Sequence, residues 1–355
     1  MNKEANINLL NGKLPNISVV IPCRNEEKYI SGLLDSILAQ DYPKERTEAI
    51  IADGMSNDST RKIIAEYVVK HGIFRLIDNP QKIVPTALNA AIKLSKGEII
   101  IRLDAHCVYP VNYFSELVRV LLETGADNVG AMWETLPGAD TLTAEAIAIT
   151  ISHPFGVGNA VYRTQTNRTE PFEVDTVPFG CFKRSVFDRI GYFDEELVRN
   201  QDNEFNERLL KNGGKIVLIP TLKLKYFARE NYVTLWKMFY QYGLYGPLVD
   251  KKLQKPTRLR RYIPSIFVSS LILPLVASVL HKNLRYLTFL SAGLYALCAS
   301  VFSLIISYKK QNPLLLPFLW LAFLVSHLSY GIGYFAGLNL VRNSGNVNYQ
   351  PDISR

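Results

Sequence analysis

Cysteine is scarce in this sequence, and no two cysteines share a short motif. The four stand singly at Cys23, Cys107, Cys181 and Cys298, so there is no CxxC pair. Structural zinc sites and disulfide-stapled domains both need cysteines in closely spaced sets. The sequence therefore gives neither a zinc finger nor a disulfide framework, and it favours a reducing compartment.

Glycine motifs that cradle phosphates are also missing. The sequence has no GxGxxG and no GxxxxGK[ST], so neither a dinucleotide-binding fold nor a P-loop has support. Residues 1–15 are polar and interrupted by Gly12 and Pro15, so we expect them to form an N-terminal extension and not a signal peptide.

Charge is absent from three long stretches near the C-terminus. Ile263–Leu280, Tyr286–Ser307 and Leu314–Val341 contain no Lys, Arg, Asp or Glu. A helix that crosses a bilayer needs about 20 such residues. A buried helical hairpin of a soluble protein is the alternative, but three runs in succession favour a transmembrane region of about three helices over residues 263–341.

The chain is basic overall, with a net charge of +8 and a pI near 9.1, which suggests an acidic partner. Much of this charge lies just before the first apolar run, at Lys251, Lys252, Lys255, Arg258, Arg260 and Arg261. Because basic residues beside a span stay cytoplasmic, we expect a multi-pass protein of the inner or plasma membrane whose large N-terminal domain is cytoplasmic. No nucleic-acid partner is expected, since the cluster does not follow a reader helix.

The first hundred residues alternate between strand and helix patterns. Strand-like runs lie at Ile17–Pro22, Glu48–Gly54, Phe74–Pro80 and Glu98–Asp104, and helical patterns at Ile30–Leu38, Thr60–Lys70 and Thr86–Leu94. Strands that alternate with helices indicate a parallel sheet covered by helices, which places the domain in the α/β class.

Polar residues gather where these strands end, at Arg24, Asn25, Glu26, Asp53, Asp104 and His106. Open sheets of this class bind ligands beyond the carboxyl ends of their strands. Alternation along an extended chain predicts that Asp104 and His106 face the same side. Carboxylates with one imidazole suit Mg²⁺ or Mn²⁺ bridged to phosphates, although His106 also fits an ordinary loop histidine and Asp58 a helix cap.

Five segments in order carry a family resemblance: ISVVIPCRNEEKYI, IIADGMSNDST, ALNAAIKLSKGEIIIRLDAH, VPFGCFKRSVFDRIGYFDEEL and NQDNEFNERLLKNGGKI. Together they resemble the family 2 inverting glycosyltransferases, which have a GT-A fold (a Rossmann-like mixed sheet that binds nucleotide-diphospho-sugars). The chain is similar in particular to membrane-associated exopolysaccharide transferases of the succinoglycan-assembly type. The resemblance implies a catalytic domain over residues 16–230, before an amphipathic interfacial segment (231–262), the transmembrane region (263–341) and a tail (342–355).

The resemblance also implies roles for individual residues. The nucleotide-sugar would bind to Pro22, Arg24, Asn25, Glu26, Asp53 and Asp104. Asp104 and His106 would hold Mn²⁺ or Mg²⁺ on the diphosphate, with His106 replacing the usual second acid of the DxD motif. Asp202 would be the catalytic base, and the acceptor would meet Phe179, Gly180, Cys181 and Gln201.

These roles imply transfer of a sugar from a nucleotide-diphosphate sugar, with uridine as the expected base, to a polyprenyl-linked saccharide in cell-surface polysaccharide assembly. Trp236 and Tyr242, among nearby lysines, suit a segment at the bilayer surface. Two alternatives remain open: a polyprenyl-phosphate glycosyltransferase, and a catalytically inactive membrane protein that binds sugar nucleotides.

Overall fold

The computed structural model describes residues 14–164, 166–256 and 261–343. The chain divides into two compact units. The first contains residues 1–134 and 165–226, and the second contains residues 135–164 and 227–355. The segment 135–164, which lies in the middle of the expected catalytic domain, therefore groups with the C-terminal helices. The expected domain boundaries remain a prediction.

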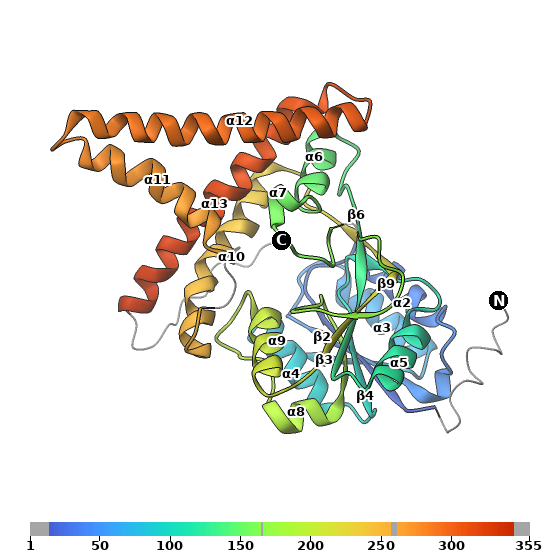
Figure 1. Cartoon of the computed structure of the whole chain (residues 1–355). Coiled ribbons are helices and arrows are strands. Elements are labelled where there is room, and N and C mark those ends of the chain that lie inside the picture. The colour runs from blue at the N-terminus through green and yellow to red at the C-terminus, as the bar shows by residue number, and fades with distance from the viewer. Residues whose placement is uncertain (1–13, 165, 257–260, 344–355) are drawn as a thin grey trace. The chain divides into compact units, whose positions relative to one another are not determined.

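The first unit is built on a mixed β-sheet (Figure 1). Within the described residues the strand order is β3-β2-β1-β4-β8-β6-β9-β5, with β7 on β9. The strands are β1 (Ile17–Cys23), β2 (Thr47–Asp53), β3 (Phe74–Asp78), β4 (Ile99–Arg102), β5 (Cys107–Val108), β6 (Asn128–Leu136), β7 (Phe172–Glu173), β8 (Cys181–Lys183) and β9 (Ile216–Phe227). β1, β2, β3 and β4 pair in parallel, whereas β4 pairs with β8 in antiparallel fashion.

Helices cover this sheet, and the predicted alternation of strand and helix is confirmed. The helices are α2 (Ile30–Leu38), α3 (Thr60–Lys70), α4 (Val84–Leu94), α5 (Tyr113–Thr124), α8 (Arg184–Ile190) and α9 (Gln201–Lys211), with a 3₁₀ turn η1 (Lys44–Arg46). In α2 the buried face is Ile30, Leu33, Leu34 and Ile37, at helical spacing. β1 lies between β2 and β4, so the chain leaves β1 at the point where the strand order reverses, and crevices for ligands form there.

One expectation about β4 is wrong. The strand ends at Arg102, and Ala105 and His106 lie in a turn before β5. Alternation applies only to an extended chain, so it cannot place Asp104 and His106 on one side. The turn forms because the N–H of Asp104 donates to the hydroxyl of Tyr109 at 2.9 Å, and that hydroxyl donates back to the Asp104 carbonyl at 3.3 Å.

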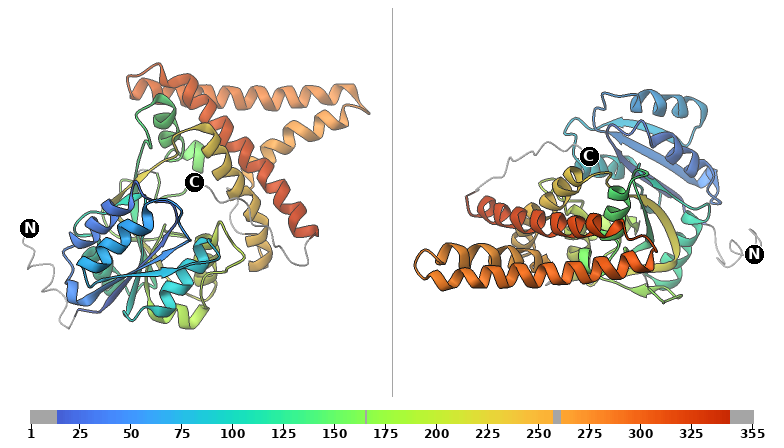
Figure 2. Two further views of the ribbon diagram at one scale, coloured as in Figure 1. Left: turned by 180° about the vertical axis from the view of Figure 1, so that it is seen from behind. Right: turned by 90° about the horizontal axis from the view of Figure 1, so that it is seen from above.

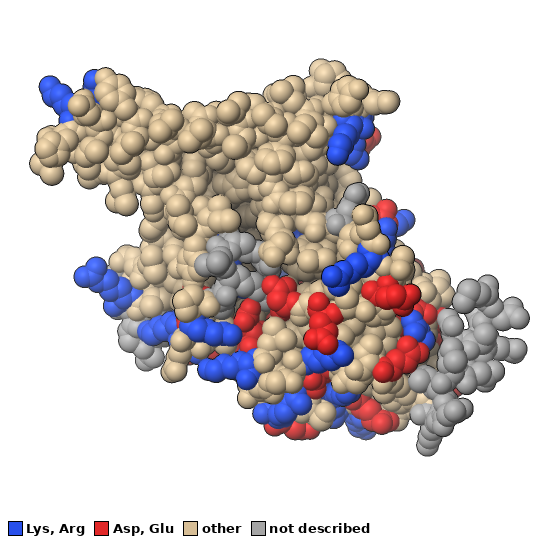
Figure 3. All heavy atoms as spheres, viewed as in Figure 1, with Lys and Arg blue, Asp and Glu red and all other residues tan. Residues whose placement is uncertain are grey.

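The second unit is helical. It consists of α6 (Leu142–Thr150), α7 (Pro154–Val157), α10 (Tyr232–Leu253), α11 (Ile263–Ala277), α12 (Arg285–Lys309) and α13 (Leu315–Asn343), with a 3₁₀ turn η3 (Lys282–Leu284). α11 and α12 form a hairpin that packs against α13 (Figure 2). The surface over this hairpin is nearly free of charged side chains except at its ends, as Figure 3 shows.

Two helices of the second unit are long and apolar enough to cross a bilayer: Lys282–Lys309 and Leu315–Arg342. The third apolar run forms α11, which has only 15 residues. At 1.5 Å per residue it is about 22 Å long, shorter than the roughly 30 Å hydrocarbon core. The expectation of three spanning helices is therefore corrected to two candidates and one short apolar helix.

Glycines bring α10 and α13 into close contact. A Cβ at Gly243 of α10 would collide with the carbonyl of Tyr330, and one at Gly333 of α13 would collide with the carbonyl of Tyr240. Small residues of this kind let two helix backbones approach each other closely. Much of α10 is consequently buried, although Trp236 remains 37% exposed. Its expected place at a bilayer surface remains a prediction.

Candidate active site

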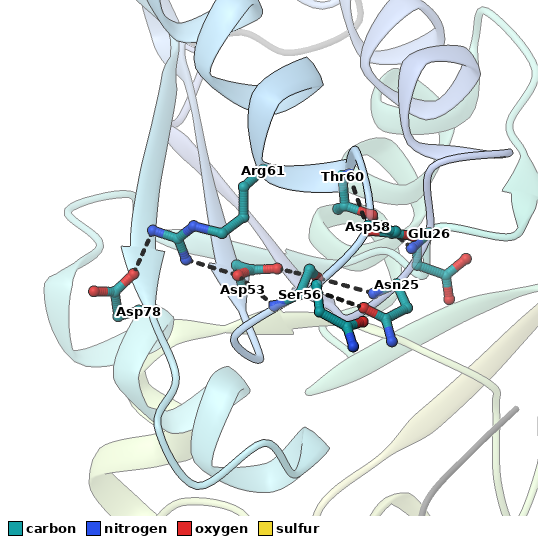
Figure 4. A network of polar contacts seen from close by, with 9 residues as sticks. Asn25, Glu26, Asp53, Ser56, Asp58, Thr60, Arg61 and Asp78 are labelled. Atoms are coloured by element: carbon teal, nitrogen blue, oxygen red, sulfur yellow. Dashed lines mark hydrogen bonds and ion pairs between the residues drawn. The ribbon is translucent and has the colours of Figure 1, made fainter.

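The turn after β1 is held by the loop after β2 through direct hydrogen bonds (Figure 4). The N–H of Asn25 donates to Ser56 Oγ at 2.9 Å, and Asn25 Oδ1 accepts from the N–H of Asn57 at 3.0 Å. Pro22 lies opposite Ala52 in the pairing of β1 with β2. Gly54 packs against the aliphatic part of Arg24, which a side chain at Gly54 would crowd. The structure thus brings the predicted donor-binding residues of both strands together.

Asp53 is completely buried at the centre of this cluster. Its carboxylate accepts hydrogen bonds from the N–H and the hydroxyl of Ser56. Arg61 of α3 forms an ion pair with Asp53 at 2.7 Å and reaches Asp78 at the end of β3 at 2.8 Å. Buried carboxylates need such compensation. Arg61, Ser56 and Asp78 were not among the predicted site residues, and they belong to the polar cluster around Asp53.

Asp58 caps α3, as its alternative interpretation predicted. Its Oδ1 accepts the N–H of Thr60 at 3.0 Å and its Oδ2 accepts the N–H of Glu27 at 3.3 Å. Slight burial opposes ionisation, but the hydrogen bonds from Thr60 and Glu27 outweigh it and lower the pKa of Asp58. The carboxylate therefore stays ionised, which also suits the positive end of a helix.

Asp104 faces a buried cation. Arg102 is 5% exposed, and its Nη2 lies 3.2 Å from Asp104 Oδ1 and 3.4 Å from Oδ2, with Nε 3.3 Å from Oδ1. These bonds are long for a charged pair. The Asp104 side chain is 19% exposed, so its carboxylate is open to a ligand.

His106 lies close to the turn after β1. Its Nδ1 is 4.0 Å from Glu26 Oε1, and its ring meets Tyr226 of β9 edge-on, with centroids 5.4 Å apart. Glu26 and His106, both predicted site residues, are therefore neighbours in space.

The side chains available as ligands determine how a divalent cation could bind. Within the described ranges, no three His, Cys, Asp or Glu side chains gather into a metal site. Mg²⁺ and Mn²⁺ commonly use one or two protein ligands together with substrate phosphates. A carboxylate at Asp104 and an imidazole at His106 fit a cation shared with a diphosphate, and they do not fit one held by protein alone.

The predicted acceptor segment is strained. Phe179 has φ of 60° and Gly180 has φ of 98°, and positive φ at a bulky residue such as Phe179 is a genuine outlier. The carbonyl of Gly180 accepts the N–H of Arg102 at 3.0 Å, and the Arg102 guanidinium lies 5.5 Å from the centre of the Phe179 ring. Burial raises the pKa of the Cys181 thiol far above its usual range, so Cys181 is an inert packed thiol.

A buried amide network anchors this segment, and no sequence pattern predicted it. Asn206 of α9 donates to Thr176 Oγ1 at 2.8 Å and to the carbonyl of Val177 at 3.2 Å. Its own Oδ1 accepts from Asn128 of β6 at 2.9 Å. These bonds fix α9 relative to the irregular segment that precedes Phe179.

The first turn of α9 carries two acids with different surroundings. Glu204 is buried and paired with Arg208 through two bonds of 2.8 and 3.0 Å. Asp202 is partly exposed, and its Oδ1 accepts the N–H of Asn203 at 2.8 Å. In the described part of the chain Oδ2 of Asp202 has no hydrogen-bond donor. Of these two acids, Asp202 has the more exposed side chain; its neighbour Gln201 is buried.

Backbone strain is concentrated in these same segments. Of the five described non-glycine residues of the first unit with positive φ, four lie in or beside these segments: Asn25, Met55, Phe179 and Asn200, at 54°, 57°, 60° and 63°; the fifth is Lys82. Strained residues of this kind persist where the surrounding structure fixes them, and they cluster at functional sites. The turn after β1, the loop after β2 and the predicted acceptor segment each contain one, and the fourth is the N-cap residue of α9.

Comparison with known proteins points to one family. Residues 18–191 match the model of glycosyl transferase family 2. The chain is 27% identical over 322 residues to the succinoglycan biosynthesis protein ExoA of Rhizobium meliloti, a match that covers 90% of this chain and 94% of that protein. It is 28% identical over 244 residues to a dolichyl N-acetyl-α-D-glucosaminyl phosphate glucuronosyltransferase of Methanococcus voltae, covering 66% and 74%.

Solved structures show the same fold. The mannosyltransferase PcManGT of Pyrobaculum calidifontis, determined with GDP-Man and Mn²⁺, has a TM-score of 0.57 at 16% identity and covers 92% of this chain and 93% of its own. TarS of S. aureus with UDP-GlcNAc has a TM-score of 0.50 at 17% identity, covering 92% and 91%. The sheet is thus the α/β mixed sheet of the GT-A type. The chain is a family 2 glycosyltransferase related to exopolysaccharide and dolichyl-linked glycosyltransferases.

Proposed function

We propose that this enzyme transfers a sugar from a nucleoside-diphosphate sugar, with uridine as the base, to a lipid-linked saccharide during cell-surface polysaccharide assembly. The observation that carries the proposal is the similarity to ExoA over nearly the whole chain. The acceptor class is supported by the Methanococcus voltae relative, whose name describes a saccharide on a dolichyl phosphate.

The residues divide the reaction among them. Asp202 accepts the proton of the acceptor hydroxyl as that oxygen attacks the anomeric carbon, a step that a positioned base accelerates by about 10²–10⁴-fold. Attack opposite the leaving group inverts the anomeric centre in one step. Asp104 and His106 would hold Mn²⁺ or Mg²⁺, which neutralises charge on the departing diphosphate. Pro22, Arg24, Asn25, Glu26 and Asp53 surround the nucleoside. Phe179, Gly180, Cys181 and Gln201 belong to the acceptor side, where the fully buried Cys181 contributes by packing.

A membrane location would bring the enzyme close to a lipid-linked acceptor. α12 and α13 are the candidate spans, and the proposal includes a cytoplasmic catalytic domain in a multi-pass inner-membrane protein. Confinement of enzyme and lipid acceptor to one bilayer raises their effective concentration.

One observation supports a second class of acceptor. A dolichyl-phosphate β-glucosyltransferase of Trichomonas vaginalis is 31% identical over 107 residues, which cover 28% of this chain. Its name describes transfer to a lipid phosphate and not to a sugar hydroxyl. The match is much shorter than that to ExoA, so the saccharide acceptor is favoured.

The test is a donor and acceptor screen with the full chain in nanodiscs. UDP-, GDP- and dTDP-sugars are offered with polyprenyl phosphate, with a polyprenyl-diphosphate saccharide or with a soluble saccharide, and nucleoside diphosphate release is read. We expect release only with a UDP-sugar and the lipid-linked saccharide. Equal rates with the soluble saccharide would contradict the lipid acceptor, and release with polyprenyl phosphate alone would favour the second candidate.

A further inference from the structure

Arg102 is a buried arginine whose hydrogen bonding is incomplete. Its side chain is 6% exposed, yet Nη1 has no hydrogen-bond partner within the described residues. The remaining nitrogens reach only Asp104, at 3.2–3.4 Å. A guanidinium has five N–H donors in a fixed fork, and buried polar groups are normally satisfied. One N–H edge of this cation is therefore buried without an acceptor among the described residues.

The position of Arg102 ties it to both substrates. It ends β4 immediately before the Asp104 turn, its N–H donates to the Gly180 carbonyl at 3.0 Å, and its guanidinium lies over the ring of Phe179. The stack continues from Phe179 to Trp133 at 5.5 Å and from Trp133 to Tyr226 at 4.0 Å. Arg102 thus stands between the residue proposed to act on the diphosphate and the segment proposed to meet the acceptor.

The charges of the Asp104–His106 motif affect what Arg102 can bind. A DxD motif presents two carboxylates, whereas here the second position is His106, and the remaining carboxylate faces Arg102. A cation that approached Asp104 alone would meet one carboxylate already shared with a guanidinium. A diphosphate that arrives with the cation supplies the missing negative charge, because phosphate oxygens suit a guanidinium fork.

We propose that Arg102 is a positioning residue that holds Asp104 when the donor site is empty and pairs with the donor diphosphate when the site is filled. This inference rests on the proposed function, since it assumes a nucleoside-diphosphate donor. Its consequence is that a divalent cation and a nucleoside diphosphate bind cooperatively, with Arg102 as the source of much of the coupling.

The experiment measures Mn²⁺ and UDP binding to the full chain in nanodiscs. Free Mn²⁺ is counted by electron paramagnetic resonance with and without UDP, for the wild type, R102Q and the control R119Q. Arg119 pairs with Glu116 and Glu123 on α5, away from the Asp104 turn in sequence and outside the predicted site. Coupling of about 5–150-fold is typical of two linked ligands.

We expect UDP to tighten Mn²⁺ binding at least tenfold in the wild type and in R119Q. In R102Q, Mn²⁺ alone should bind several-fold tighter, because Asp104 is released, and the coupling should fall about tenfold. If R102Q matches the wild type within twofold in both quantities, the inference is overturned. Absence of UDP binding by the wild type would count against the proposed function, whereas the comparison with Mn²⁺ alone would still decide the role of Arg102.

A second variant covers the case in which R102Q does not fold. D104N removes the partner of Arg102 and leaves the guanidinium in place. In EDTA, calorimetry should show that D104N binds UDP several-fold tighter than the wild type, because Arg102 is then free for the diphosphate. A D104N protein that binds UDP in EDTA no better than the wild type would overturn the inference.

Discussion

The guanidinium of Arg61 and the carboxylate of Asp53 form an ion pair of 2.7 Å in which the Asp53 side chain is fully buried and the Arg61 side chain is 37% exposed. The same guanidinium reaches Asp78 on the neighbouring strand at 2.8 Å. Arg61 therefore fixes the ends of β2 and β3 relative to each other, at the edge where the proposed nucleoside binds. Loss of Arg61 should therefore weaken donor binding more than it slows sugar transfer.

We predict that Arg61→Met raises the KM for the donor about tenfold, equivalent to about 1.4 kcal/mol, and leaves kcat within about twofold. Hydrogen bonds to charged groups contribute about 1.5–3 kcal/mol, and the exposure of Arg61 reduces that figure. Steady-state kinetics at saturating acceptor measure both constants. Arg75→Gln, an exposed arginine of β3, is the control. An unchanged KM in Arg61→Met would remove this network from donor binding.

The cap of α3 should depend on pH. The pKa of Asp58 is lowered in the folded chain from its ordinary value of 3.8, so its ionised form contributes stability above that value. This contribution is lost as the pH falls through the folded pKa. We predict that Asp58→Ala destabilises the chain by about 1 kcal/mol at pH 7.

Asp58→Asn separates the charge from the cap, because an asparagine still accepts the N–H bond. Chemical denaturation of this variant should show a deficit against the wild type at pH 7 that shrinks below about pH 4. Asp188→Asn, an exposed acid of α8 with no ion pair within the described residues, is the control. A deficit that stays constant from pH 7 to pH 3 would show that the charge of Asp58 has no part in it.

At position 106, a side chain with an oxygen ligand should preserve metal binding better than one with no ligand atom. We predict that activity requires Mn²⁺ or Mg²⁺ and is removed by a chelator. His106→Ala should lower the affinity for Mn²⁺ in the presence of UDP by about 10–100-fold, and His106→Asp should retain more of it. Titration calorimetry measures both variants against His281→Ala, an exposed histidine before α12. Full activity in EDTA would contradict the metal role of Asp104 and His106 together.

The contact between α10 and α13 should be sensitive to a single methyl group. A Cβ at Gly333 would meet the carbonyl of Tyr240, whereas a Cβ at Gly293 of α12 would meet nothing within 4 Å. We predict that Gly333→Ala lowers the unfolding temperature in detergent by several degrees. Gly293→Ala should leave it unchanged or raise it, since alanine favours a helix by about 1 kcal/mol over glycine. Equal effects of the two substitutions would contradict the close packing of α10 on α13.

The strands and helices between residues 17 and 104 were predicted well because their signal is local. In β1 and β2 nearly every side chain is buried, so the apolar runs alone reveal them. The polar residues at the strand ends follow from the same reasoning, since parallel strands end at one edge of the sheet. The cap at Asp58 was also readable from its place before α3.

The rest depends on contacts between distant positions. Asn128 and Asn206 lie 78 positions apart, and no short pattern announces their bond. Arg102 looked like an interior residue of a strand that ended at Asp104, and its partners Asp104 and Phe179 become visible only when β4 and β8 are paired. The segment 135–164 joins the C-terminal helices through packing such as that of α6 on α13, which has no periodic signature. The alternation argument at His106 failed because a turn replaced the extended chain.

The central claim is that Asp202 acts as the base of a sugar transfer from a nucleoside-diphosphate donor. The most direct measurement compares Asp202→Asn with the wild type, with single-turnover transfer of a radiolabelled sugar and the Kd of UDP determined on the same preparations. The substitution keeps the size of the side chain and the oxygen that accepts the N–H of Asn203. We predict a transfer rate lower by about 10²–10⁴-fold with the Kd of UDP changed by less than about threefold. Transfer by Asp202→Asn at a rate near that of the wild type would contradict the claim.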